Sequence, residues 1–130
     1  MNCGPRLGVI EAGAELDTRV RHAIDRIEEQ LHRPLTTEEL ARSAGLSVAQ
    51  FTRLFRQATG TTPGVFLRRL RLARARLLIE RTALSVADVM AQVGVTDRSH
   101  FARDFRSAHG FSPRMLRMHL RARDRGRRSG

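Results

Sequence analysis

A pattern of phenylalanine, glycine and proline occurs twice in this chain and constrains its fold more than any other feature. The repeated pairs, each separated by 50 positions, are Phe51 and Phe101, Phe55 and Phe105, Gly60 and Gly110, and Pro63 and Pro113. A further pair, Gly45 and Gly94, is separated by 49 positions, so we place one extra residue at the start of the helix that follows the second glycine. Two copies are too few for a solenoid. The pattern therefore predicts two related units.

The first copy predicts two short helices joined by a tight turn. Thr36 caps the first helix, and Glu39 three residues later completes a capping box. Gly45 ends that helix in the left-handed conformation that glycine tolerates. Ser47 and Gln50 form a second capping box at the start of the next helix. Such a segment of about 20 residues with a glycine in its turn is typical of a helix-turn-helix.

The second copy repeats this organisation. Ser85 caps a helix with Asp88 three residues on, and Gly94 ends it. Thr96 or Asp97 caps the helix that follows.

Helices flank both copies. The segment from Asp17 to His32 has one apolar face, formed by Val20, Ile24, Ile27 and Leu31, and Pro34 stops it. A helix begins at Pro63 and runs to about Glu80, with a stripe formed by Phe66, Leu70, Ala73 and Leu77. A last helix begins at Pro113. We therefore expect an all-α fold of about seven helices.

The domain boundaries follow from these signals. We expect an irregular lead-in (1–16), a first helix-turn-helix unit (17–62), a linker helix (63–80), a second helix-turn-helix unit (81–121) and a basic, disordered tail (122–130).

Composition points to an anionic partner. The chain has 24 basic residues, all of them arginine, against 13 acidic residues, and a net charge of +11. The planar fork of arginine suits phosphate and guanine, and such a basic balance is typical of nucleic-acid binding. A GC-rich genome accounts for the choice of arginine over lysine but not for the excess of basic residues.

There is no apolar run long enough for a membrane span, and the single cysteine excludes an intrachain disulfide.

A helix-turn-helix lays its second helix in the major groove of DNA, so the face opposite the buried stripe carries the base-reading residues. Arg53 and Arg103 occupy matching positions on these faces and suit the two acceptors of guanine. Gln50 belongs to a capping box, and we favour capping over base reading for it.

A second set of residues suits the phosphate backbone. It lies at the N-termini of helices, which attract anions, or on the neighbouring basic surface. We expect backbone contacts from Ser47, Arg56, Thr62, Arg68, Arg69, Thr96, Arg106, Ser112, Arg114 and Arg117.

The linker helix sets the spacing of the two copies. At about 1.5 Å per residue it spans roughly 26 Å. Successive major grooves on one face of DNA recur at roughly 34 Å. We expect the two recognition helices to enter adjacent grooves, with bending of the DNA if the spacing falls short.

Catalytic and metal chemistry find little support. The five histidines are scattered, and His100 and His109 have no cysteine or acidic partner at ligand spacing. There is no phosphate-binding loop or nucleophile elbow. We expect no enzyme activity, no metal and no cofactor.

The segment from about Asp17 to Arg121 resembles the C-terminal DNA-binding domain of the AraC/XylS family of bacterial transcription regulators. The second copy, SVADVMAQVGVTDRSHFARDFRSAHGFSPRMLR, follows that family's signature most closely. The resemblance implies seven helices, two helix-turn-helix units bridged by a long helix, and sequence-specific binding to double-stranded DNA, usually to activate transcription. By position, it assigns base reading to Ala49, Thr52, Arg53, Arg98, Ser99, Ala102 and Arg103.

The chain departs from the family pattern at two positions. Ala49 stands where relatives often carry a larger side chain, and His100 stands where an aromatic residue is common. The resemblance also implies either a small stand-alone member acting as a monomer or a piece of a larger regulator. Its expected partners are double-stranded DNA and RNA polymerase, at the nucleoid in the cytoplasm, with no role at a membrane.

Two alternatives remain open at this point. One is a sequence-indifferent, basic DNA-packaging protein, and the other is a protein-interaction module that keeps the fold.

Overall fold

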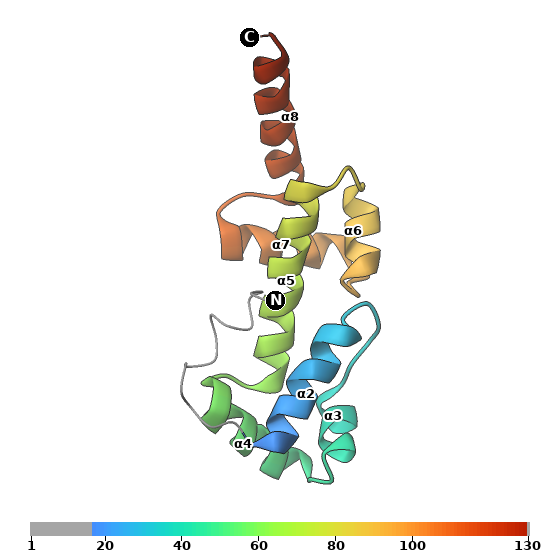
Figure 1. Ribbon diagram of the computed structural model, residues 1–130, viewed down its shortest axis with the longest axis vertical. Coiled ribbons are helices and arrows are strands. Elements are labelled where there is room, and N and C mark those ends of the chain that lie inside the picture. Colours follow the sequence, from blue (N-terminus) through green and yellow to red (C-terminus); the bar gives the residue numbers. More distant parts are fainter. Residues whose placement is uncertain (1–16, 130) are drawn as a thin grey trace. The chain divides into compact units, whose positions relative to one another are not determined.

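The computed structural model describes residues 17–129 and contains seven helices and no strand over that range. The helices are α2 (Thr18–Glu29), α3 (Thr37–Ser43), α4 (Val48–Thr59), α5 (Pro63–Arg81), α6 (Val86–Gln92), α7 (Arg98–His109) and α8 (Pro113–Ser129) (Figure 1). The predicted all-α class is confirmed. The predicted lead-in, 1–16, lies outside the described residues. The chain divides into two compact units, one ending at Leu70 and the other beginning at Arg71.

The core of the first unit forms around α2 and a pair of phenylalanines. Val20, Ile24 and Ile27 on α2 are fully buried, which confirms the predicted apolar face. Phe51 and Phe55 on α4 are also fully buried. Helices α3 and α4 pack against each other, and α4 packs against α2.

Helix α2 ends earlier than predicted, at Glu29 rather than His32. Gln30 caps it by donating its backbone N–H to the carbonyl of Arg26, and the chain then turns toward Pro34. Since the residue before a proline disfavours helical angles, the turn comes ahead of Pro34. Leu31 remains buried although it lies beyond the helix.

The core of the second unit repeats this arrangement. Phe101 and Phe105 on α7 are buried, with ring centroids 5.7 Å apart, the same separation as between Phe51 and Phe55. Val89 in α6 and Val93, its C-cap, are fully buried in the same core cluster. Ala108, one turn after Phe105 on α7, is exposed.

Helix α5 contributes to both cores, and its buried residues do not follow the predicted stripe. Phe66 and Leu70 are buried in the first unit as expected. The predicted continuation, Ala73 and Leu77, is only partly buried. In the second unit, the buried residues of α5 are instead Leu72, Ala75 and Ile79. The buried face therefore changes within the helix, because each half is selected by a different core.

The prediction of a disordered tail is wrong for residues 122–129, which continue α8 as a helix to Ser129. Arginine and alanine are good helix formers, and the helix is already nucleated by packing of Leu116. The helix continues through Gly126, where glycine costs only about 1 kcal/mol relative to alanine.

The extra residue of the second copy lies in the turn and not in the helix after it. Ser47 caps α4 and Asp97 caps α7, so these two caps are themselves 50 positions apart. Thr96 is the additional turn residue, and Asp97, not Thr96, accepts the backbone N–H of His100 at 2.9 Å.

None of the helices in the described range is long and apolar enough to cross a membrane.

Candidate nucleic-acid interface

In the first unit, α4 carries an exposed face opposite its buried phenylalanines. Arg53 and Ala49 are exposed, and Thr52 is half-buried. No hydrogen bond or ion pair within residues 17–129 engages the Arg53 side chain. The guanidinium is therefore available to a ligand.

Gln50 is held in the turn before α4. Its backbone N–H donates to Ser47 Oγ at 3.1 Å, and its Oε1 accepts the backbone N–H of Ser47 at 3.1 Å. This reciprocal pair confirms the capping box and occupies the amide oxygen of Gln50. Bidentate reading of adenine by this amide would require the box to open.

In the second unit, α7 presents the corresponding face with more polar side chains. Arg98, Ser99 and Arg103 are exposed, and Ala102 is half-buried. His100 pairs with Asp104 one turn later, with 3.3 Å between Nε2 and Oδ2. His100 is thus occupied on its own helix, while Arg103 has no partner within the described residues.

A hollow of about 290 Å³ in the second unit brings together residues that we had assigned to different roles. Arg98 and Ala102, at the start of α7, line it together with Ser112 and Arg114 at the start of α8. Ser112 Oγ accepts the backbone N–H of Met115 at 3.1 Å and so caps α8. Two arginines and a helix N-terminus at one hollow favour an anion there.

The other residues predicted to contact phosphate are mostly accessible. Those that are exposed are Ser47, Arg56, Arg68, Arg69, Thr96, Arg106 and Arg114. Thr62 is half-buried, and its Oγ1 accepts the backbone N–H of Val65 at 3.4 Å.

Arg117, also predicted to contact phosphate, has a partner within the second unit. It is half-buried, and its Nη2 donates to the backbone carbonyl of Ile79 at 3.5 Å, near the end of α5. This contact satisfies one of the carbonyls that a helix C-terminus leaves without an intrahelical partner. Arg117 therefore has a structural role in the second core that sequence spacing does not reveal.

Arg76 is also used inside the second unit. Its guanidinium lies 5.3 Å from the centroid of the Phe111 ring, and its Nε pairs with Glu80 at 3.1 Å. Its Nη1 lies 3.4 Å from Nδ1 of His109, whose Nε2 faces the carbonyl of Leu72 at 3.3 Å. These contacts separate Arg76 from the arginines that are available to a ligand.

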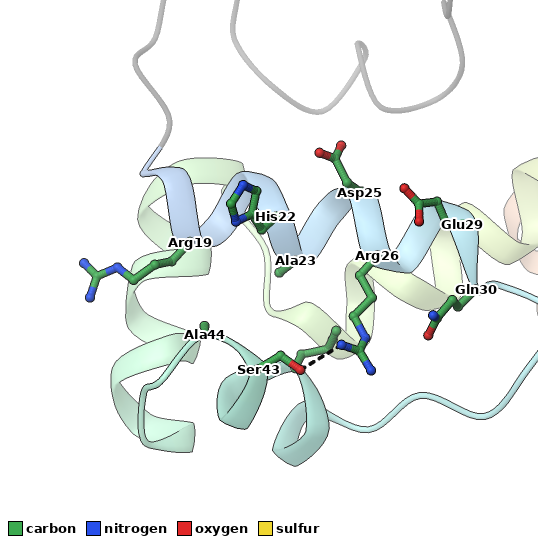
Figure 2. A pocket seen from close by; sticks show the side chains of 10 residues that line it. Arg19, His22, Ala23, Asp25, Arg26, Glu29, Gln30, Ser43 and Ala44 are labelled. Atoms are coloured by element: carbon green, nitrogen blue, oxygen red, sulfur yellow. Dashed lines mark hydrogen bonds between the residues drawn. The ribbon is translucent and has the colours of Figure 1, made fainter.

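A larger groove, of about 520 Å³, lies between α2 and α3 in the first unit (Figure 2). Side chains of both charges line it, including Arg19, Asp25 and Glu29, and Arg26 Nη1 donates to Ser43 Oγ at 2.9 Å across it. None of the predicted DNA-contacting residues lies there.

No group of three or more His, Cys, Asp or Glu suited to a metal ion occurs in the part of the chain that the structure describes.

Sequence reasoning missed Val48. This residue is the first of α4 and is 42% exposed, which makes it one of the large apolar side chains that face solvent. It matches Arg98, the first residue of α7, and that mismatch between two otherwise similar copies was the available signal.

Two short helix pairs, each with a capped second helix that buries phenylalanines and exposes arginine, define a protein with two helix-turn-helix units. Residues 40–119 match the family described as Helix-turn-helix domain. This chain belongs to that family, in its AraC-type branch.

Relatives and solved structures agree with this assignment. The HTH-type transcriptional activator RhaS of Escherichia fergusonii is 34% identical over 109 residues, which cover 84% of this chain and 39% of that protein. The transcriptional activator NphR of a Rhodococcus species is 43% identical over 101 residues, 77% of this chain and 29% of that protein. This chain thus spans well under half the length of either relative.

Among solved structures, the DNA-binding domain of AdpA, a global transcriptional factor crystallised in complex with a target DNA, superposes with a TM-score of 0.76 at 31% identity, over 81% of this chain and 95% of that one. An AraC-type regulator from Chromobacterium violaceum superposes with a TM-score of 0.71, also at 31% identity, over 79% of this chain and 92% of that one.

Proposed function

We propose that this chain binds double-stranded DNA sequence-specifically and serves as the DNA-binding part of a transcription regulator. Helices α4 and α7 would each enter a major-groove segment, and the two segments would be adjacent. The observation that carries the proposal is the pair Arg53 and Arg103, at matching positions on two capped helices, both exposed and without partners in the described range. Arginine at such a position suits the O6 and N7 acceptors of guanine.

The two sets of predicted residues would have different roles. Base edges would be read by Ala49, Thr52, Arg53, Ser99, Ala102 and Arg103. Arg98 lines the hollow with Arg114. In the proposed complex its side chain would reach both a base edge and a phosphate. Arg114, with the N-terminus of α8, would hold a phosphate and fix the register of α7 without specifying sequence.

Regulation is the role that the relatives support. RhaS and NphR are transcriptional activators, and the AdpA domain was crystallised with its target DNA. We propose that this chain likewise acts at a promoter in the bacterial nucleoid, as an activator in contact with RNA polymerase. An enzymatic role has no support in the family, whose members are regulators.

Competition binding tests the proposal. Sites are first obtained by in vitro selection of bound DNA and mapped by footprinting. Binding to a selected site is then competed with a scrambled duplex at about 0.15 M salt, where non-specific binding is weak. We expect a specificity ratio of about a thousand or more. A ratio near one would support a DNA-packaging protein instead, and no binding even at low salt would support a protein-interaction module.

A further inference from the structure

The first turn of α4 presents methyl groups to solvent where the first turn of α7 presents charge. Val48 is 42% exposed, Ala49 is exposed and Thr52 is half-buried. Val48 and Ala49 lie four and three residues before Thr52, so both are its neighbours on the helix surface. Three methyl-bearing side chains thus share one part of the exposed face.

The polar side chain that could compete for this turn is held elsewhere. Both the backbone N–H and the amide oxygen of Gln50 are engaged with Ser47, at 3.1 Å each. The amide oxygen of Gln50 is therefore not free to accept from a ligand, and Val48 and Ala49 are the apolar side chains that this turn exposes. Arg53 supplies a positive charge beside this surface, because it lies four residues after Ala49 and is its neighbour on the helix.

The matching positions of the second unit have a different chemistry. Arg98 stands in place of Val48, and Ser99 in place of Ala49. Arg98 also lines a hollow with Arg114, whose counterpart in the first unit is Gly64. The two units share a fold and a reading arginine, but not the surface at the start of the recognition helix.

The 5-methyl group of thymine is the one apolar group that a base pair presents in the major groove, and apolar side chains contact it. We infer that the first unit selects an A·T pair through contact of a thymine methyl with Val48, supported by Ala49 and Thr52, beside the guanine read by Arg53. At the matching positions the second unit carries Arg98 and Ser99 instead, and it selects its half-site through polar contacts from them. This inference rests on the proposed function and assigns a base class to one of its two units.

The test removes the thymine methyl group from the DNA and, separately, the Val48 side chain from the protein. Each thymine of a selected site is replaced in turn by deoxyuridine, which lacks only the 5-methyl group, and the dissociation constants of the two duplexes are compared at about 0.15 M salt. Three proteins are used: the unchanged chain, Val48→Ser, and the matched control Arg98→Ala. Because Val48 is exposed, Val48→Ser is expected to fold, which thermal unfolding by circular dichroism checks.

We expect one thymine whose replacement weakens binding of the unchanged chain about fourfold, the effect of one buried methyl-sized group. For Val48→Ser, the ratio of the dissociation constants of the deoxyuridine and thymine duplexes should fall to nearly one. For Arg98→Ala it should stay at about fourfold, although overall affinity drops.

Three results would overturn the inference. If no thymine shows an effect while the selected site still outcompetes scrambled DNA, the inference fails and the proposed function stands. If a thymine effect survives Val48→Ser unchanged, the methyl is read by another residue and the inference also fails. If selected and scrambled duplexes bind equally, the proposed function fails and this inference fails with it.

Discussion

At the scale of single residues, arginine has two kinds of role in this chain. Arg53, Arg103 and Arg114 are exposed. Arg76 and Arg117 instead make contacts within the second unit, with the Phe111 ring and the Ile79 carbonyl respectively. Burial also lowers the pKa of Arg71 from its ordinary value. Net charge alone therefore overstates the number of arginines that DNA can reach.

Arg103→Ala should lower affinity for the selected site by about 1–3 kcal/mol and relax base preference at one position, because it removes a bidentate contact to guanine. Arg114→Ala should weaken binding to all sequences alike and reduce the salt slope by about one. Binding isotherms over a series of salt concentrations and single-base variants measure both. If the two variants lost affinity equally for every sequence, the division into reading and positioning residues would be wrong.

Asp17 caps α2 and carries a pH-dependent contribution to folding. Hydrogen bonds from the Arg19 side chain and backbone hold the pKa of its carboxyl at about 2, below the ordinary 3.8. A lowered pKa means that the contribution is complete above the ordinary value and is lost as the pH falls toward 2. We expect NMR of the carboxyl carbon to give a midpoint near 2.

The matched variant for this titration is Arg19→Ala, which should move the midpoint of Asp17 up toward 3.8 because the side-chain partner is gone. A midpoint that did not move would show that Arg19 is not the cause of the lowered pKa.

At the scale of elements, the helix ends define the recognition helices. Ser47 with Gln50 starts α4, and Asp97 starts α7. Both helices end at a glycine in the left-handed region, Gly60 at φ 83° and Gly110 at φ 89°. The positions of Arg53 and Arg103 relative to the turns follow from these fixed ends.

Gly110→Ala should destabilise the chain by about 1–2 kcal/mol, since a Cβ is strained at this φ. A Cβ there would meet no atom within 4 Å, so the cost lies in the backbone alone. The control is Gly126→Ala within α8, also free of steric conflict, which should be stabilising by about 0.5–1 kcal/mol. Chemical denaturation measures both. Equal effects of the same sign would contradict the assignment of strain to Gly110.

At the scale of the whole molecule, the chain builds two separate cores on one pattern. Each has a phenylalanine pair on its recognition helix, and α5 supplies Phe66 and Leu70 to one core and Leu72 and Ile79 to the other. Two small cores give each unit limited stability of its own.

Phe105→Ala should cost about 3–5 kcal/mol, mainly in the second unit. Hydrogen exchange should show a large loss of protection for amides of α7 and a smaller loss for those of α2 and α4. Phe55→Ala is the matched control and should give the reverse pattern. Equal losses in both units for either variant would mean that the two cores unfold as one.

The amino-acid sequence by itself predicted the elements whose causes are local. The buried face of α2, the Ser47–Gln50 box and the turn glycines follow from spacing and residue type within a few positions, and the repeat showed that there are two units.

Tertiary structure alone decided the features that depend on residues far apart in the chain. Packing against two cores moved the buried face within α5, and folding of the second unit brought the Arg117 guanidinium to the carbonyl of Ile79. Folding of the second unit also brought Arg98 and Arg114 to one hollow. Periodicity within one helix specifies which residues can share a face, but only the partner that packs against the helix determines which of its faces is buried.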